Sequence, residues 1–115
     1  MKYTGSCHCG KVAYEVEGDI NGVISCNCSM CQRKGALLWF VPREKLVLRT
    51  PQSEMGTYLF NKHVINHYFC RTCGIHPFAE GTDRGGKKMA AVNIRCLEGI
   101  DLGAIAVTPF DGRSL

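Results

Sequence analysis

Seven of the eight cysteines in this chain fall into three short clusters, and their spacing constrains the fold more than any other feature. The clusters are Cys7-His8-Cys9, Cys26-Asn27-Cys28-Ser29-Met30-Cys31 and Cys70-Arg71-Thr72-Cys73. Thiolates so close together in sequence can face a single ion, and zinc binds four of them in a tetrahedral arrangement. Seven ligands divide into a closed set of four and a set of three, and a three-thiolate zinc keeps one position open for a further ligand.

A disulfide scaffold is the alternative interpretation of many cysteines in a short chain, and it requires an oxidising compartment. The chain begins Met1-Lys2-Tyr3-Thr4, with no apolar signal segment before the first cysteine. Its longest apolar run, residues 36–41, is far shorter than a membrane span. We therefore expect a cytoplasmic protein with reduced, metal-binding thiols and no membrane partner.

The composition, with 45% hydrophobic and 21% charged residues in 115, predicts a single globular zinc-binding domain over residues 1–115. The formal net charge of +4 counts each cysteine as neutral, and seven metal-bound thiolates would cancel most of this excess. Adjacent basic residues occur only at Arg33-Lys34 and Lys87-Lys88, so charge does not favour a nucleic-acid partner. No pattern in the sequence predicts an oligomeric state.

Short apolar runs and period-two alternation predict a mostly β fold. Residues 11–17 alternate Val12, Tyr14 and Val16 with polar or small residues, which is typical of a half-buried strand. The run at 36–41, stopped by Pro42, predicts a fully buried strand. Further strands are expected at 23–25, 45–49, 56–60, 64–69, 88–93 and 103–107.

One short helix is expected inside the second cysteine cluster. Ser29 would cap a turn from Met30 to Lys34, and Gly35 would end it. Cys31 would then lie in the first turn, where the helix dipole favours a thiolate.

The Cys70-x-x-Cys73 pair followed by Gly74 has the form of a zinc knuckle, although thiol redox enzymes share this spacing. A redox pair would be expected to begin a helix, and Pro77 argues against a helix of any length there. Cys7-x-Cys9 is the natural second pair for this site. Spacing alone also allows Cys26 and Cys28 to join Cys70 and Cys73.

The cluster of Cys26, Cys28 and Cys31 could be a structural site closed by a fourth ligand. His63, His67, His76 and Cys96 are the candidates for that ligand. We expect Cys96 to be a small buried hydrophobe instead, because it has no neighbouring cysteine in sequence.

Four stretches of the chain carry a resemblance to one family. They are Gly5-Ser6-Cys7-His8-Cys9-Gly10-Lys11-Val12, Cys26-Asn27-Cys28-Ser29-Met30-Cys31-Gln32-Arg33-Lys34-Gly35-Ala36, Phe69-Cys70-Arg71-Thr72-Cys73-Gly74-Ile75 and the tail Phe110-Asp111-Gly112-Arg113. Together they resemble the glutathione-dependent formaldehyde-activating enzyme family, also called the centromere-protein-V-type domain, over essentially the whole chain.

The resemblance implies a fold similar to the Mss4-like zinc-binding folds, in which small curled antiparallel β-sheets carry cysteine knuckles, with at most one or two short helical turns. It also implies two zinc ions. By resemblance, a structural zinc is held by Cys7, Cys9, Cys70 and Cys73, and a catalytic zinc by Cys26, Cys28 and Cys31.

The implied activity is that of a lyase that joins glutathione and formaldehyde into S-(hydroxymethyl)glutathione, or cleaves the carbon–sulfur bond in reverse. Zinc deprotonates a bound thiol, which suits a glutathione sulfur that attacks formaldehyde. The aldehyde oxygen then needs a proton, for which His63, His67 and His76 are candidates. Arg33 and Lys34, beside the second cluster, are candidates for binding the glutathione carboxylates.

Other functions fit the same residues. A non-catalytic zinc module for a protein or nucleic-acid partner predicts a fully ligated second zinc. A glutathione carrier predicts binding without turnover. Thiol redox activity at Cys70 and Cys73 predicts a metal-free pair that alkylating agents can reach.

Overall fold

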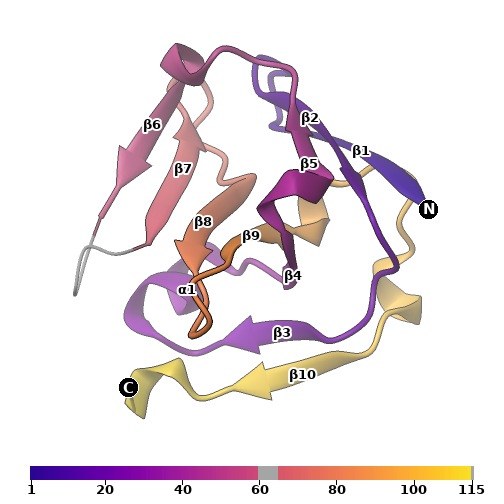
Figure 1. Cartoon of the computed structure of the whole chain (residues 1–115), viewed down its shortest axis with the longest axis vertical. Helices are drawn as coiled ribbons and strands as arrows, with labels where there is room; N and C mark the ends of the chain where they lie inside the picture. Colours follow the sequence, from indigo (N-terminus) through magenta and orange to yellow (C-terminus); the bar gives the residue numbers. More distant parts are fainter. Residues whose placement is uncertain (60–64, 115) are drawn as a thin grey trace.

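The structure is a computed structural model that describes residues 1–59 and 65–114. Strands predominate in these residues, as the sequence predicts, and Figure 1 shows them arranged around a common interior. His63 lies outside the described residues, and so do parts of the strands predicted at 56–60 and 64–69. Within the described residues, no helix is long and apolar enough to cross a membrane.

The described strands form two sheets. The smaller sheet has the order β1-β2-β5, and the larger has the order β10-β3-β4-β9-β8-β7-β6. The strands are β1 Lys2–Ser6, β2 Ala13–Glu17, β3 Val23–Cys26, β4 Leu38–Pro42, β5 Leu46–Leu48, β6 Met55–Tyr58, β7 Asn66–Cys70, β8 Phe78–Thr82, β9 Lys88–Asn93 and β10 Val107–Phe110. The helical segments are α1 Ser29–Lys34 and the 3-10 turns η1 Arg43–Lys45, η2 Gln52–Glu54, η3 Ile94–Cys96, η4 Leu102–Ala104 and η5 Gly112–Ser114.

One strand pair departs from the antiparallel arrangement that the resemblance implies. β10 runs parallel to β3, with Val107 opposite Val23 and Phe110 opposite Cys26 (Figure 1). A parallel pair requires a long connection that returns the chain to the same end of the sheet. Residues 27–106 form this connection, and their last part, residues 94–106, leads from the end of β9 to the start of β10 beside Val23. The strand predicted at 103–107 is wrong, because η4 covers residues 103 and 104 and β10 begins only at Val107.

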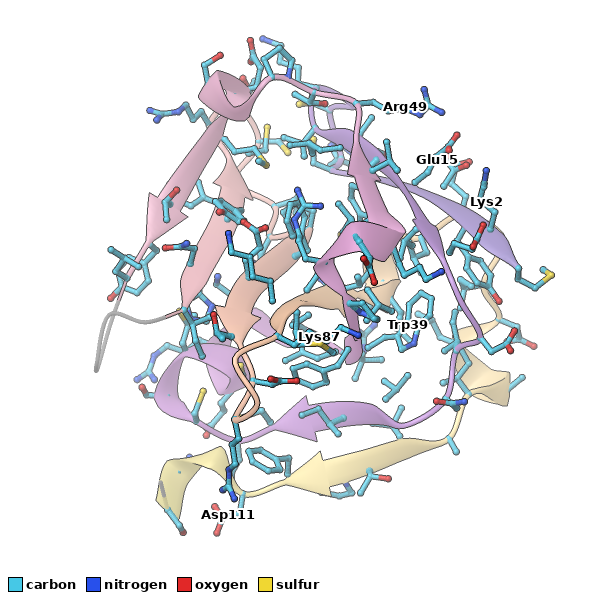
Figure 2. All side chains as sticks on the ribbon, in the orientation of Figure 1. Lys2, Glu15, Trp39, Arg49, Lys87 and Asp111 are labelled. Carbon is cyan, nitrogen blue, oxygen red and sulfur yellow. The ribbon has the colours of Figure 1, made fainter. Side chains whose placement is uncertain are left out.

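The interior is filled by one face of each sheet. Tyr14 on β2 is fully buried, and its ring meets Phe78 of β8 edge-on, with ring centroids 5.7 Å apart. Trp39, Val92 and Phe78 lie opposite one another on three neighbouring strands. Figure 2 shows Trp39 inside the ring of strands. This packing buries the hydrophobic face that the alternation at residues 11–17 predicts.

The outer face of β2 is polar, as that alternation also predicts. Glu15 lies between Tyr14 and Val16 on β2 and forms an ion pair with Arg49. Lys2, Glu15 and Arg49 lie along this outer side in Figure 2. Exposed ion pairs of this kind contribute little to stability, so the sheet depends on its buried face.

The predicted strand at 36–41 is present as β4, but the expectation that it is fully buried is wrong. Trp39 and Val41 are buried against the interior, whereas Phe40 is 47% exposed. Alternate side chains of a strand point to opposite faces, so Phe40 lies on the face that turns away from the core. An unbroken apolar run does not distinguish a strand with two buried faces from one that borders an open cleft.

Two strands carry no clear signal in the sequence. β1 reads Lys-Tyr-Thr-Gly-Ser and β8 reads Phe-Ala-Glu-Gly-Thr, and both contain a glycine that weakens the strand pattern. Gly5 is required at its position, because a Cβ there would lie 2.6 Å from the ring of Tyr14.

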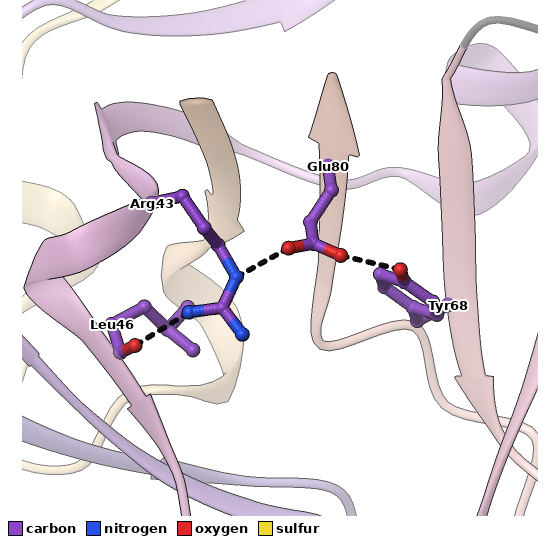
Figure 3. A network of polar contacts seen from close by, with 4 residues as sticks. All are labelled: Arg43, Leu46, Tyr68 and Glu80. Carbon is purple, nitrogen blue, oxygen red and sulfur yellow. Dashed lines mark hydrogen bonds and ion pairs between the residues drawn. The ribbon is translucent and has the colours of Figure 1, made fainter. Parts of the chain in front are cut away.

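A polar network fixes β8 against its neighbours (Figure 3). The carboxylate of Glu80 accepts hydrogen bonds from the Arg43 guanidinium and the Tyr68 hydroxyl. Arg43 also donates to the Leu46 carbonyl at 2.6 Å. Both oxygens of Glu80 are therefore engaged on the side of β8 that faces the core.

Candidate functional site

Four cysteines from two distant parts of the chain meet at one end of the molecule. The Sγ atoms of Cys7, Cys9, Cys70 and Cys73 all lie within 4.8 Å of one another. The Sγ–Sγ distance is 3.6 Å both from Cys7 to Cys9 and from Cys9 to Cys70. Ligands at about 2.3 Å from a tetrahedral zinc lie about 3.8 Å apart, so this donor set fits a zinc ion.

Tight turns position these sulfurs. Gly10 and Gly74 follow the two cysteine pairs with φ of 83° and 81°, a left-handed conformation that favours glycine. Backbone N–H groups point at the sulfurs: Thr72 donates to Cys70 Sγ at 3.3 Å. Such donors stabilise thiolates, and the N–H of Ile75 leads the effects that lower the pKa of Cys73 to about 6.

The remaining three clustered cysteines form a separate group. Cys26 ends β3, Cys28 precedes α1 and Cys31 lies in its first turn, and their Sγ atoms lie within 4.8 Å of one another. Cys26 and Cys28 therefore do not join Cys70 and Cys73, which was the other partition that spacing allowed. None of the eight cysteines, all of which are described, is in a disulfide.

The helix begins differently from the sequence expectation. Cys28 is the N-cap in place of Ser29, and its Sγ accepts the Cys31 N–H at 3.4 Å. Gly35 ends the helix in a left-handed conformation, as predicted. Burial acts to raise the pKa of Cys28. The net pKa is nevertheless lowered, because the N–H groups of Cys31 and Met30 and the neighbouring thiols donate hydrogen bonds to its sulfur. Burial instead raises the pKa of Cys31 to about 12, which opposes the effect of the helix dipole.

The three-cysteine group has no fourth ligand among the described residues. No described His, Cys, Asp or Glu side chain joins it, so His67, His76 and Cys96 stay outside. Cys96 lies beside Asn93 and the carbonyl of His76, and burial raises its pKa to about 11. Cys96 is only partly buried and contacts polar groups, so the expectation that it is a small buried hydrophobe is wrong.

The three-cysteine group opens onto a cleft of about 490 Å³. This volume is typical of small-molecule sites. Its walls include α1 and the open face of the large sheet. The residues that line it are Ile24, Cys26, Cys28, Met30, Cys31, Lys34, Ala36, Leu38, Phe40, Ile65, His67, His76, Ala79, Glu80, Gly81, Thr82, Asp83, Met89, Ala91, Phe110 and Gly112.

Two of the predicted proton carriers, His67 and His76, line this cleft. Burial, together with the nearby Lys34 ammonium, lowers the pKa of both imidazoles to about 4, so both are neutral at pH 7. His76 Nδ1 lies 2.7 Å from the Tyr68 carbonyl oxygen. A carbonyl oxygen only accepts, so Nδ1 carries the proton and Nε2 keeps a lone pair.

Arg33 and Lys34 border a second hollow of about 520 Å³ beside α1, with Ser29, Met30, Tyr58, Phe69 and Gly74. The two hollows share Met30 and Lys34, so they adjoin. Arg33 is exposed and donates to the Ser29 carbonyl at 2.8 Å. Both predicted carboxylate-binding residues thus lie beside the three-cysteine group.

The C-terminal tail, residues 110–114, packs against the three-cysteine group. No pattern in the sequence predicts this contact. The N–H of Asn27 donates to the Phe110 carbonyl at 3.1 Å, and its side-chain amide donates to Asp111 at 3.0 Å. The Arg113 N–H donates to the Asn27 side-chain oxygen at 2.9 Å. These contacts hold Gly112 so close that a Cβ on it would lie 2.5 Å from Cys26 Sγ. Figure 2 shows Asp111 at this end of β10.

Two comparisons agree with this architecture. The sequence model of the glutathione-dependent formaldehyde-activating enzyme family matches residues 2–106. A crystal structure of a Rhodobacter sphaeroides protein is 34% identical and superimposes with a TM-score of 0.78, covering 94% of this chain and 100% of that one. The match includes both cysteine groups and nearly the whole fold. The chain therefore belongs to the glutathione-dependent formaldehyde-activating enzyme family.

Proposed function

We propose that this chain is a zinc-dependent carbon–sulfur lyase or synthase that acts on a glutathione–aldehyde adduct, with S-(hydroxymethyl)glutathione as the simplest substrate. One observation carries the proposal: three thiols, from Cys26, Cys28 and Cys31, gather at a substrate-sized cleft without a fourth protein ligand among the described residues. Cys7, Cys9, Cys70 and Cys73 would hold a second, structural zinc. Zinc bound by three thiolates would keep an incoming thiol deprotonated at neutral pH.

The residues around the cleft provide the other groups that the reaction needs. In the synthetic direction the sulfur of glutathione bonds to the carbonyl carbon, and the proton from the thiol ends on the former carbonyl oxygen. His76 Nε2, with its lone pair, can accept that proton and return it. Arg33 and Lys34 would bind the glutathione carboxylates in the adjoining hollow.

Replacing Cys28 with serine tests the proposed zinc site. Serine is a good N-cap, so α1 is expected to persist while one thiolate is lost. We expect zinc content to fall from two ions per chain to one and glutathione affinity to drop at least about tenfold, by isothermal titration of the full chain. Cys96→Ser is the matched control and should behave like wild type. Equal glutathione affinity in Cys28→Ser and wild type would remove this cluster from the binding site.

His76→Asn tests the proton-carrier role. Asparagine can still donate to the Tyr68 carbonyl but has no basic nitrogen, so the local structure should persist. We expect adduct breakdown to slow by about a hundredfold while glutathione affinity stays unchanged. The measurement is the rate of aldehyde release from S-(hydroxymethyl)glutathione, corrected for the uncatalysed rate. An unchanged rate would assign the proton transfer elsewhere, and a wild-type protein that binds glutathione without accelerating this release would be a carrier.

A further inference from the structure

The part of the large sheet formed by β3, β4, β8 and β9 carries apolar side chains on both faces, although only one face packs in the core. An antiparallel sheet with one open face normally carries polar side chains there. Here Leu38 and Phe40 alternate with the core residues Trp39 and Val41 on β4. Side chains directly opposite one another in the register share a face. The apolar residues of this open face are Ile24, Leu38, Phe40, Ala79, Met89, Ala91 and Phe110.

The pairing register places large and small side chains so that this face is hollow. Phe40 lies opposite Ala91, which lies opposite Ala79 on the next strand. Met89 lies opposite Gly81. Small residues on β8 and β9 therefore form the floor, while Phe40 and Phe110, 47% and 43% exposed, stand at the rim.

This apolar face leads directly to the three-cysteine group. Phe110 is paired with Cys26 at the end of β3, and Ile24 on the same strand is paired with Leu38. If the sulfur of a bound glutathione–aldehyde adduct lay near Cys26, the substituent that comes from the aldehyde would extend along this wall. All of these residues line the same cleft of about 490 Å³.

The charged side chains along the cleft provide few polar contacts for a ligand that lies on this apolar wall. Glu80 is engaged by Arg43 and Tyr68 on the core side of β8. Asp83 Oδ1 accepts the Gly85 and Lys87 N–H groups, both at 2.9 Å, within its own turn. Among the described residues that line the cleft, only Lys34 has a cationic side chain, and it lies on α1.

From this arrangement we infer that the aldehyde is one with an apolar chain of several carbons, and that formaldehyde, with a single carbon, leaves the wall empty. The inference rests on the proposed function. The carbonyl carbon would bond to the thiol sulfur near Cys26, Cys28 and Cys31, and the chain would lie along Phe40, Ala91 and Phe110. The C–S bond forms as the C=O π bond opens, the thiol proton moves to the former carbonyl oxygen, and no oxidant is needed.

Two thioethers that differ only in the sulfur substituent test the inference. S-methylglutathione and S-hexylglutathione would be titrated calorimetrically into the zinc-loaded full chain. Each methylene group removed from water improves binding about fourfold, so partial coverage of the hexyl chain predicts at least about tenfold tighter binding. Phe40→Ser should remove most of this difference. Val47→Ser is the matched control, because Val47 is also an exposed apolar residue, at 55%, but lies on β5 of the other sheet.

Equal affinities for the two thioethers in the wild-type chain would overturn the inference. A hexyl preference that Phe40→Ser leaves intact would also overturn it, because the chain would then bind elsewhere. Neither result concerns the thiol group. The proposed function is therefore tested separately, by the titration of glutathione into the wild-type chain and Cys28→Ser.

Discussion

Cys70→Ser is expected to lower the stability of the fold severely in zinc-replete buffer at 25 °C. Cys70 is buried at the end of β7, and its group connects this strand to the turn between β1 and β2, thereby joining the two sheets. Binding at a structural zinc site contributes about 10 kcal/mol or more to folding in small domains. Losing one of four thiolates should therefore lower the free energy of unfolding by about 5 kcal/mol or more, which is most of a typical domain's stability.

Urea unfolding followed by circular dichroism, with metal content measured on the same samples, checks this expectation. Cys96→Ser is again the control, because Cys96 is a partly buried cysteine that belongs to neither group. It should shift the urea midpoint only slightly. A Cys70→Ser chain with the wild-type midpoint would show that the four-cysteine group does not hold the sheets together through a metal.

Gly112→Ala is expected to weaken metal binding at the three-cysteine group by about tenfold to a hundredfold. The new methyl carbon would lie 2.5 Å from Cys26 Sγ, closer than non-bonded atoms approach. Either the sulfur leaves its place in the group or the tail leaves Asn27. Both outcomes cost free energy, because the ligand geometry is supported by the hydrogen bonds around it.

Competition with a chelator measures this affinity, and the four-cysteine group in the same chain is the internal reference. Gly103→Ala is the matched variant, since a Cβ there meets only the Asp101 carboxylate at 3.4 Å. We expect Gly103→Ala to retain both affinities. If Gly112→Ala retains them too, the tail does not support the site.

Much of the site was predictable because neighbouring residues carry the signal. The spacing within each cysteine cluster shows which thiols can face one ion, and Gly10, Gly35 and Gly74 mark the turns that bring them together. The strand at residues 11–17 was predictable for a similar reason. Its alternation records burial on one face, and Tyr14 is indeed fully buried.

The sequence did not predict features of a residue's environment that depend on distant segments of the chain. Phe40 belongs to an apolar run, and only the open cleft beside β4 explains its exposure. Cys31 lies in a first helical turn as expected, yet burial raises its pKa. Gly112 is unremarkable until β10 pairs with β3 and brings it against Cys26.

The amino-acid sequence alone determined which thiols cluster, that the chain is mostly β, and the resemblance to the family that the comparisons then showed. These properties depend on residue types a few positions apart, which local backbone geometry keeps close in any fold. Spacing left open which clusters combine, and the resemblance implied the grouping that the structure shows. Tertiary structure alone decided which wall borders the three thiols and how the tail packs on them. Those contacts join residues up to 86 positions apart, as between Asn27 and Arg113, and only strand pairing and core packing bring them together.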